Sequence, residues 1–398
     1  MKGNWFGSCG DLSDWENPDV RDEGQIKENE AIVILDAQAL RKALKPMLKR
    51  KSKLTDDHFR NSVLLSFNNG TVTLRATDMI TYVETYSSFR IEGSRPPEYP
   101  VAVDITSLEA VTRIVSEELV LGVLDDQVRV LFAGGSTHVP SYSLDPTKFN
   151  AGKIEWEREQ RTPASFLTDS LVSLKRLASA SPIIEMKMLF GASDHIYACD
   201  GISVIKSDSY FASTAIRLND VDILVSLLAT SDPDEKVVIQ ETSGYVRISS
   251  SVGIITFQKR QVMLAKQYTD ALVMPRHYFL VDPNMILKAL SMLNTIRDTG
   301  GNVTFEITPG NDGGAMLALH SKAQNGEISS MVVSRDSAGT HPKEGQFIRM
   351  TIPSAIRVLS GFAGEDFVQM GVEKKQLLIH DARATAVVIV SAIGSDAR

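Results

Sequence analysis

Seven basic residues form the densest cluster of charge in the 398-residue chain: Arg41, Lys42, Lys45, Lys49, Arg50, Lys51 and Lys53. Arg41, Lys45 and Lys49 fall on one face of a predicted helix by i, i+4 spacing. Guanidinium and ammonium groups in such a row can bind successive phosphates. Taken alone, the cluster is explained as simply by a solvated helix face.

Two aspartates follow strand-like segments at corresponding places, in Arg75-Ala76-Thr77-Asp78 and in Tyr197-Ala198-Cys199-Asp200. Paired carboxylates can act as a general acid and base. No histidine or nucleophile recurs beside them, and an aspartate at a turn typically accepts hydrogen bonds from its own backbone. We therefore interpret both as turn caps, predict no catalytic residues and do not expect an enzyme.

The spacing of the remaining residues predicts neither a metal site nor a phosphate-binding loop. The two cysteines, Cys9 and Cys199, lie far apart, which indicates a reducing compartment and no ligand pair. The glycine-rich stretch 310–314 lacks the Gly-Lys-Ser/Thr ending of a phosphate loop. We predict no metal site and no cofactor, since the histidines are also scattered: His58, His138, His195, His277, His320, His341 and His380.

The formal charge of −7 would argue against a nucleic-acid partner if it were evenly spread. Residues 1–30 hold eight acidic and three basic residues, a charge of −5, so the remaining residues carry only −2. This acidic segment is predicted to be disordered, or to present Trp5, Phe6 and Trp15 to a partner. No signal peptide or membrane span is apparent, so we expect a cytoplasmic protein with no membrane partner.

The elements that carry these residues repeat along the chain. The two aspartate turns lie 122 residues apart, and a similar order of helices and strands follows a third time, which indicates duplicated domains. We predict an acidic extension at 1–30 and domains at 31–155, 156–275 and 276–398, each of the α+β class with two helices packed on antiparallel sheets. The predicted helices are Ala37 to about Lys51, Ile105–Ser116, Leu167–Ala178, Val221–Ala229, Pro283–Ile296 and Ile352–Phe362.

Strands at the domain ends suggest how the copies are joined. The alternating segments Val128–Phe132 and Tyr245–Ile248 are typical of strands with one buried face. An unpaired edge strand invites aggregation. A closed ring, in which the edge strand of each domain pairs with the next, would remove that liability.

Several segments spread over residues 31–393 resemble the bacterial-type DNA sliding clamp, the processivity subunit of a replicative polymerase. In the first two domains they are Leu44-Lys45-Pro46, Asn61 to Leu65, Leu74 to Asp78, Met188-Leu189-Phe190 and Ala198-Cys199-Asp200-Gly201. The link into the third domain ends in Leu272-Val273-Met274-Pro275, similar to the family's Val-Leu-Pro ending. Their order and spacing carry the resemblance, because no single motif is specific.

The resemblance implies three tandem clamp domains that close as a head-to-tail homodimeric ring around duplex DNA, without catalytic activity. It also implies a replicative DNA polymerase and a clamp loader as partners, in a bacterial cytoplasm or a phage-infected host. A different hypothesis is a non-ring protein-interaction scaffold of the replication machinery. A dimer of twice the chain mass of 43.7 kDa would favour the ring over the scaffold.

With helices lining a ring, phosphate contact becomes the favoured interpretation of the basic cluster. The residues that the resemblance then implies for DNA binding are Arg41, Lys45, Lys49, Arg50, Lys51, Arg113, Lys175, Arg176, Lys288, Arg297 and Arg357. A partner-peptide pocket between the second and third domains is implied for Cys199, Gly201, Ile202, Val204, Pro275, Val388 and Val390.

The pocket departs from the family pattern. The family's Thr-Asp-Gly-His-Arg-Leu is here Cys199-Asp200-Gly201-Ile202-Ser203-Val204, and its C-terminal Val-Met-Pro-Met-Arg-Leu is replaced by Val388 to Ile393. The groove could still suit a hydrophobic peptide, although ordinary core packing explains the same residues. The altered motif and the acidic extension predict a divergent clamp, of the kind a phage or mobile element would encode.

Overall fold

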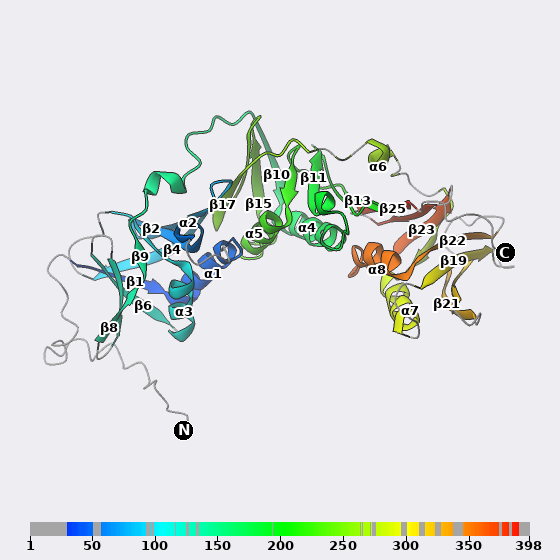
Figure 1. Cartoon of the computed structure of the whole chain (residues 1–398), viewed down its shortest axis with the longest axis horizontal. Helices are drawn as coiled ribbons and strands as arrows, with labels where there is room; N and C mark the ends of the chain where they lie inside the picture. Colours follow the sequence, from blue (N-terminus) through cyan, green and yellow to red (C-terminus); the bar gives the residue numbers. More distant parts are fainter. Residues whose placement is uncertain are drawn as a thin grey trace, which may run out of the picture. The chain divides into compact units, whose positions relative to one another are not determined.

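The structure is a computed structural model that forms two compact units. Unit 1 combines Met1–Ala164 with Asp222–Gln258, and unit 2 combines Ser165–Val221 with Lys259–Arg398 (Figure 1). The division into three domains predicted above stays a prediction. The structure describes residues 30–50, 57–92, 97, 99–115, 117–124, 127–132, 135–192, 194–262, 264, 266–270, 272, 276–295, 301–309, 315–322, 328–336, 345–373, 376–381 and 384–389.

All six predicted helices are present, with small differences at their ends: α1 (Ala37–Leu48), α3 (Ile105–Ile114), α4 (Ala164–Ser179), α5 (Leu218–Leu228), α7 (Pro283–Thr295) and α8 (Ile352–Ser360). Asp36 begins α1 as expected, because its side chain accepts a hydrogen bond from the Ala39 amide at 2.7 Å. The helix ends at Leu48 rather than near Lys51. The short helices α2 (His58–Asn61) and α6 (Lys266–Asp270) were not predicted.

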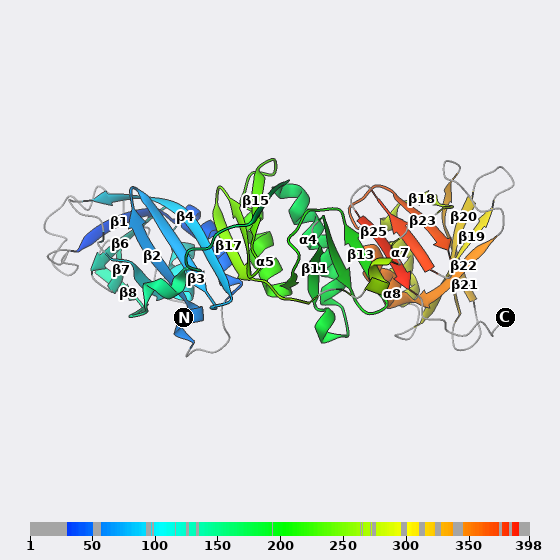
Figure 2. The same cartoon turned by 90° about the horizontal axis from the view of Figure 1, so that it is seen from above.

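One antiparallel sheet of thirteen strands runs through unit 1 (Figure 2). Its main path is β10-β15-β16-β17-β4-β1-β6-β7-β8, and β2, β3, β5 and β9 branch from it beside β4. The strands are β1 (Ala31–Asp36), β2 (Ser62–Asn68), β3 (Thr71–Thr77), β4 (Thr81–Glu92), β5 (Val101–Asp104), β6 (Glu118–Leu124), β7 (Gln127–Phe132), β8 (Gly135–Val139), β9 (Ser141–Tyr142), β10 (Arg158–Pro163), β15 (Lys236–Glu241), β16 (Tyr245–Ser250) and β17 (Gly253–Gln258).

The predicted β2–β3 hairpin is confirmed. Asn69 and Gly70 have φ of 47° and 75°, the left-handed pair that a two-residue hairpin turn requires. On the other side of β4, β17 pairs from Gly253 opposite Thr85 to Phe257 opposite Thr81. This contact joins the end of the predicted second copy to the first copy through a shared edge, as the edge-strand argument expected.

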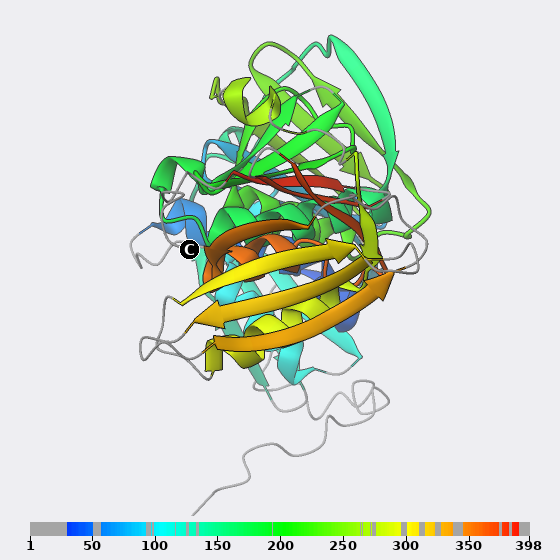
Figure 3. The ribbon, with the colours of Figure 1, turned by 90° about the vertical axis from the view of Figure 1, so that its right-hand side faces the viewer.

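Unit 2 holds the other two antiparallel sheets. The eight-stranded sheet runs β14-β11-β12-β13-β25-β24-β23-β18, and the four-stranded sheet, yellow to orange in Figure 3, runs β21-β20-β19-β22. The β13–β25 pairing, from Ser203 opposite Val388 to Ser207 opposite Ala384, joins the second copy to the third in the same way. The strands are β11 (Met188–Ala192), β12 (His195–Cys199), β13 (Ser203–Ser207), β14 (Ala215–Arg217), β18 (Phe279–Val281), β19 (Asn302–Pro309), β20 (Ala315–Lys322), β21 (Ile328–Asp336), β22 (Gln346–Thr351), β23 (Val368–Glu373), β24 (Gln376–His380) and β25 (Ala384–Ile389).

Helices cover the sheets through buried apolar faces. In unit 1, α1 packs on α3 and β4 and buries Leu40, Leu44 and Met47. In unit 2, α7 packs on α8 and buries Ile286 and Leu290. Over the described residues, no helix is long and apolar enough to span a membrane.

Candidate functional sites

The two aspartate turns have the same hydrogen-bonding geometry. Asp78 Oδ1 accepts from the amides of Ile80 at 3.0 Å and Thr81 at 2.7 Å. Asp200 Oδ1 accepts from the amides of Ile202 at 3.0 Å and Ser203 at 2.7 Å. The interpretation of both aspartates as turn caps is therefore confirmed. Among the residues that the structure describes, no group of three His, Cys, Asp or Glu side chains could hold a metal ion.

The basic face of α1 differs from the predicted one. Lys42, Lys45 and Lys49 are exposed and lie at i, i+3 and i+7, so they share one face of the helix and its end. Arg41, expected on this face, is half-buried and donates from Nη2 to the carbonyl of Thr112 in the last turn of α3. The exposed basic face of α1 therefore includes Lys42 and not Arg41, which was predicted to lie on it. Lys51 lies outside the described residues.

The prediction that Arg50 binds DNA is wrong, because the side chain is buried. Its guanidinium donates to the carbonyl of Thr77 and, at 3.1 Å, to that of Ser62. Burial lowers the pKa of Arg50 to about 10, although Asp78 and Asp57 favour its charged form. The group is still protonated at neutral pH and ties the end of α1 to the Asp78 turn.

Most of the other predicted arginines also contact the protein itself. Arg113 is exposed but pairs with Glu109 one turn away on α3. Arg176 of α4 donates to the carbonyl of Ser360 at 2.7 Å, and Arg357 of α8 donates to that of Ala180 at 3.1 Å. Each of these two arginines thus supplies a donor at the C-terminal end of the other helix, where a positive charge is favourable.

The two remaining predicted lysines lie on helices. Lys288 on α7 is exposed, and Lys175 on α4 is half-buried. Arg297 lies outside the described residues. Arg41, Arg176 and Arg357 bind carbonyls near helix ends, whereas Lys45 and Lys288 are exposed on α1 and α7.

The predicted peptide pocket is only partly a surface. Cys199 and Val204 are fully buried in an apolar cluster with Phe190, Tyr197 and Leu378, which makes them core residues and corrects their assignment to an open groove. Burial also raises the pKa of the Cys199 thiol to about 11. Val388 pairs with Ser203 through the strand backbone. Pro275 and Val390 lie outside the described residues.

Three isoleucines provide exposed apolar surface here, and Ile184, at 77%, is the most exposed of them. Ile202 and Ile183 are each 40% exposed. Gly201, with φ of 90°, lies against Ile183, because a Cβ atom at Gly201 would be 2.5 Å from Ile183 Cδ1. Ile202 was among the predicted pocket residues, whereas Ile183 was not. The adjacent apolar pair Ile183-Ile184, placed after a helix end in a turn, was the available signal.

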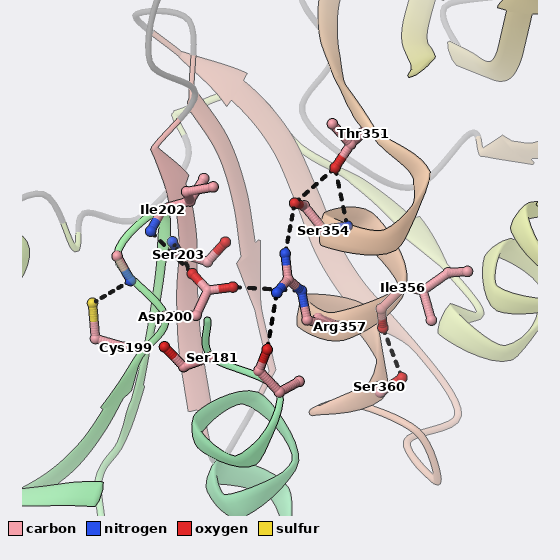
Figure 4. Close-up of polar contacts among 12 residues, drawn as sticks. Ser181, Cys199, Asp200, Ile202, Ser203, Thr351, Ser354, Ile356, Arg357 and Ser360 are labelled. Carbon is pink, nitrogen blue, oxygen red and sulfur yellow. Dashed lines mark hydrogen bonds and ion pairs between the residues drawn. The ribbon is translucent and has the colours of Figure 1, made fainter. Parts of the chain in front are cut away.

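Arg357 lies beside the Asp200 turn (Figure 4). Its Nε is 3.6 Å from Asp200 Oδ2, and its Nη2 donates to Ser354 Oγ at 3.0 Å. The Asp200 side chain is fully buried, whereas 22% of the Arg357 side chain is exposed. Arg357 thus contacts this turn, and its contact with DNA stays a prediction.

Comparison with solved structures identifies the fold. The DnaN sliding clamp of Bartonella birtlesii, solved with griselimycin bound, matches with a TM-score of 0.72 and 17% identity over 91% of this chain and 99% of that one. The clamp of Pseudomonas aeruginosa matches at 0.73 with 15% identity over 90% and 99%, and DNA polymerase III subunit beta of Borrelia burgdorferi at 0.73 with 10% identity over 91% and 100%. No family model and no curated protein matches the sequence. The chain has the fold of a complete bacterial clamp protomer.

Proposed function

We propose that this protein is a DNA sliding clamp, a ring that encircles duplex DNA and tethers a replicative polymerase without reading base sequence. The observation that carries the proposal is the fold match over about nine-tenths of this chain and nearly all of each bacterial clamp. It favours the clamp over a non-ring scaffold, because the similarity spans a whole protomer. The proposed setting is the bacterial cytoplasm or a phage-infected host, and no catalytic step is assigned.

A head-to-tail homodimer is the proposed form of the ring. Two end strands are suited to its closure: β8, which pairs only with β7 among the described strands, and β21, which pairs only with β20. β21 has nine residues, the longest of the end strands in the predicted third copy. Pairing of β8 in one protomer with β21 of its partner would cover both edges and repeat the joins seen inside the chain.

The DNA contacts that we propose are lysines on the helices and at the end of α1, all exposed except the half-buried Lys175. Lys42, Lys45 and Lys49 form the main group, and Lys175 and Lys288 add weaker contacts from other helices. Lysine binds phosphate as a point charge on a flexible stem. Few contacts of this kind give weak attraction to the backbone that is independent of sequence, which suits a ring that must slide.

The partner site that we propose lies at the Asp200 turn of unit 2. Ile183 and Ile202 would receive apolar side chains of a polymerase or loader peptide, next to the buried cluster that contains Cys199 and Val204. Pro275, in the link into the predicted third domain, and Val390 belong to the proposal from the sequence alone. Replacement of the family's His and Arg by Ile202 and Ser203 favours a more apolar partner segment than the usual one.

Retention on DNA tests the ring directly. The protein is mixed with linear DNA so that rings thread over the ends, the DNA is ligated into circles, and the sample is washed in about 1 M NaCl, where charges are screened beyond about 3 Å. A ring stays on the circles and leaves after a restriction cut. Equal loss from circular and linear DNA, or a monomeric mass near 43.7 kDa, would contradict the proposal.

The proposed lysine–phosphate interactions are tested by the salt dependence of equilibrium binding. Replacement of Lys42, Lys45 and Lys49 by serine should reduce the slope of log K against log salt by up to about 0.9 for each phosphate that is no longer neutralised. A charge-matched control replaces the exposed Lys153, Lys187 and Lys236, which lie on a loop, a turn and a strand. An equal decrease in both variants would show that net charge, and not this face of α1, sets the affinity.

A further inference from the structure

Arg357 connects three segments of unit 2 through one guanidinium group. Its Nη1 donates to the carbonyl of Ala180, just beyond the end of α4, at 3.1 Å. Its Nε is 3.6 Å from Asp200 Oδ2, and its Nη2 donates to Ser354 in the first turn of α8 at 3.0 Å (Figure 4). The planar fork of donors on arginine can hold such partners together in a fixed arrangement, which a single ammonium group cannot do.

The Asp200 carboxylate depends on this arrangement. It is fully buried, and its Oδ1 already accepts from two backbone amides of its own turn. Its Oδ2 makes no hydrogen bond in the structure and has the guanidinium of Arg357 as its ion-pair partner. A buried carboxylate that loses its counter-charge is strongly destabilised, so the turn would rearrange if Arg357 were removed.

The segments held by Arg357 are those that carry Ile183 and Ile202. Ala180 precedes Ile183 by three residues, and the intervening Ser181 side chain accepts from the Ile183 amide at 3.1 Å. Asp200 fixes the amide of Ile202. Ile183 in turn contacts Gly201, as the short approach of its Cδ1 shows. Arg357 contacts both the segment that leads to Ile183 and the turn that carries Ile202, so its contacts bear on the distance between these two side chains.

We infer that Arg357 is a positioning residue for the apolar partner site, because it fixes the Asp200 turn and the Ala180–Ile183 segment relative to each other. The inference rests on the proposed function, in which Ile183 and Ile202 receive an apolar peptide segment. The residue acts from the third predicted copy on a turn of the second. It therefore makes the peptide site depend on both copies being correctly joined.

Arg176 provides a matched control. It makes the reciprocal contact, from α4 to the carbonyl of Ser360 at the end of α8, at 2.7 Å. The structure gives Arg176 no hydrogen bond or ion pair to Asp200 or to the segment that carries Ile183. Replacement of Arg176 by methionine removes the same charge and one helix-end contact, but it should leave the turn in place.

The experiment compares Arg357→Met, Arg357→Lys and Arg176→Met in the full-length chain. Amide hydrogen exchange at Ile202 and Ser203 reports the turn, and the anisotropy of a fluorescein-labelled heptapeptide with two leucines and a phenylalanine among serines reports the site. We expect Arg357→Met to raise exchange at both amides and to weaken peptide binding, each by roughly 10-fold, with Arg357→Lys intermediate. Arg176→Met should change both by less than about 2-fold.

The outcomes separate the inference from the proposed function. If the unmodified protein does not bind the peptide, the proposed peptide site fails for this class of ligand, and the exchange data still decide whether Arg357 holds the turn. Unchanged exchange in Arg357→Met, or faster exchange with unchanged peptide affinity, would overturn the positioning role. If Arg357→Met does not fold, Arg357→Lys is judged by the same two criteria.

Discussion

The turns at Asp78 in unit 1 and Asp200 in unit 2 have the same backbone hydrogen bonds but are held by arginines of different origin. Arg50 follows α1 and reaches the Asp78 turn from within the same predicted copy, bonding the carbonyls of Thr77 and Ser62. Arg357 comes from α8 and reaches the Asp200 turn from another copy. The same turn is therefore held in two ways. An arginine of the same predicted copy holds it in unit 1, and an arginine of another predicted copy contacts it in unit 2.

The residues just before and just after the two aspartates also differ between the turns. Before the aspartate, Thr77 Oγ1 accepts from the Met79 amide at 2.8 Å, whereas Cys199 Sγ accepts from the Gly201 amide at 3.4 Å. After it, both turns use a left-handed residue, Met79 with φ of 70° and Gly201 with φ of 90°. In unit 1 the residue at this position is Met79, which has a side chain. In unit 2 it is Gly201, and the side chain of Ile183 occupies the space where a Cβ atom would lie.

The largest expected effect is at Arg50. Replacement by methionine leaves two buried carbonyls without their donor and should lower the free energy of unfolding by about 3 kcal/mol. Hydrogen exchange of β3 and β4 amides in denaturant measures this loss. The exposed neighbour Lys49 is the control, since Lys49→Met should change stability by less than about 0.5 kcal/mol. Equal effects of the two variants would mean that Arg50 does not support the turn from inside.

The next effect is expected at the left-handed position. Gly201→Ala should cost about 1–2 kcal/mol, because the new Cβ atom meets both an unfavourable φ and the Ile183 side chain. Met79→Gly should change the free energy of unfolding by less than about 0.5 kcal/mol, since relief of strain is offset by the greater freedom of the unfolded chain. Chemical denaturation of both variants measures the difference. Equal costs would remove this distinction between the turns.

The smallest effect is chemical, at the residue before the aspartate. Burial raises the pKa of the Cys199 thiol to about 11, so at pH 8 roughly 0.1% is thiolate, which is the form that reacts with iodoacetamide. In a Cys9→Ser background, the alkylation rate of Cys199 should be very low and should rise about tenfold per pH unit up to about pH 10. A rate that levels off near pH 9 would indicate an exposed, ordinary thiol.

Local features were predictable from the sequence. The Asp36 cap, the Asn69-Gly70 hairpin and the two aspartate turns depend on residues within three positions of one another, and all are confirmed. The pairing of edge strands between copies followed from the need to cover unpaired edges, and it is confirmed in the β4–β17 and β13–β25 contacts.

The assignments that failed depended on distant partners. Arg50 was assigned to DNA binding with the rest of the basic cluster, but α1 ends at Leu48 and the Arg50 guanidinium donates to carbonyls of β3 and β2. Arg357 and Asp200 lie far apart in the sequence, and neither carries a local signal of the other. Helical periodicity also could not distinguish an arginine that binds a carbonyl near a helix end, such as Arg41, from an exposed lysine.

The β4–β17 pairing has a consequence for synthesis on the ribosome. Thr81–Thr85 of β4 leaves the ribosome well before its partner, because β17 ends at Gln258, and the intervening chain includes the unit 2 segment Ser165–Val221. At 5–20 residues per second this delay is roughly ten to thirty seconds. During that time the nascent first copy presents an open strand edge. The first copy can complete this sheet edge only with β17, which is translated after the unit 2 segment Ser165–Val221.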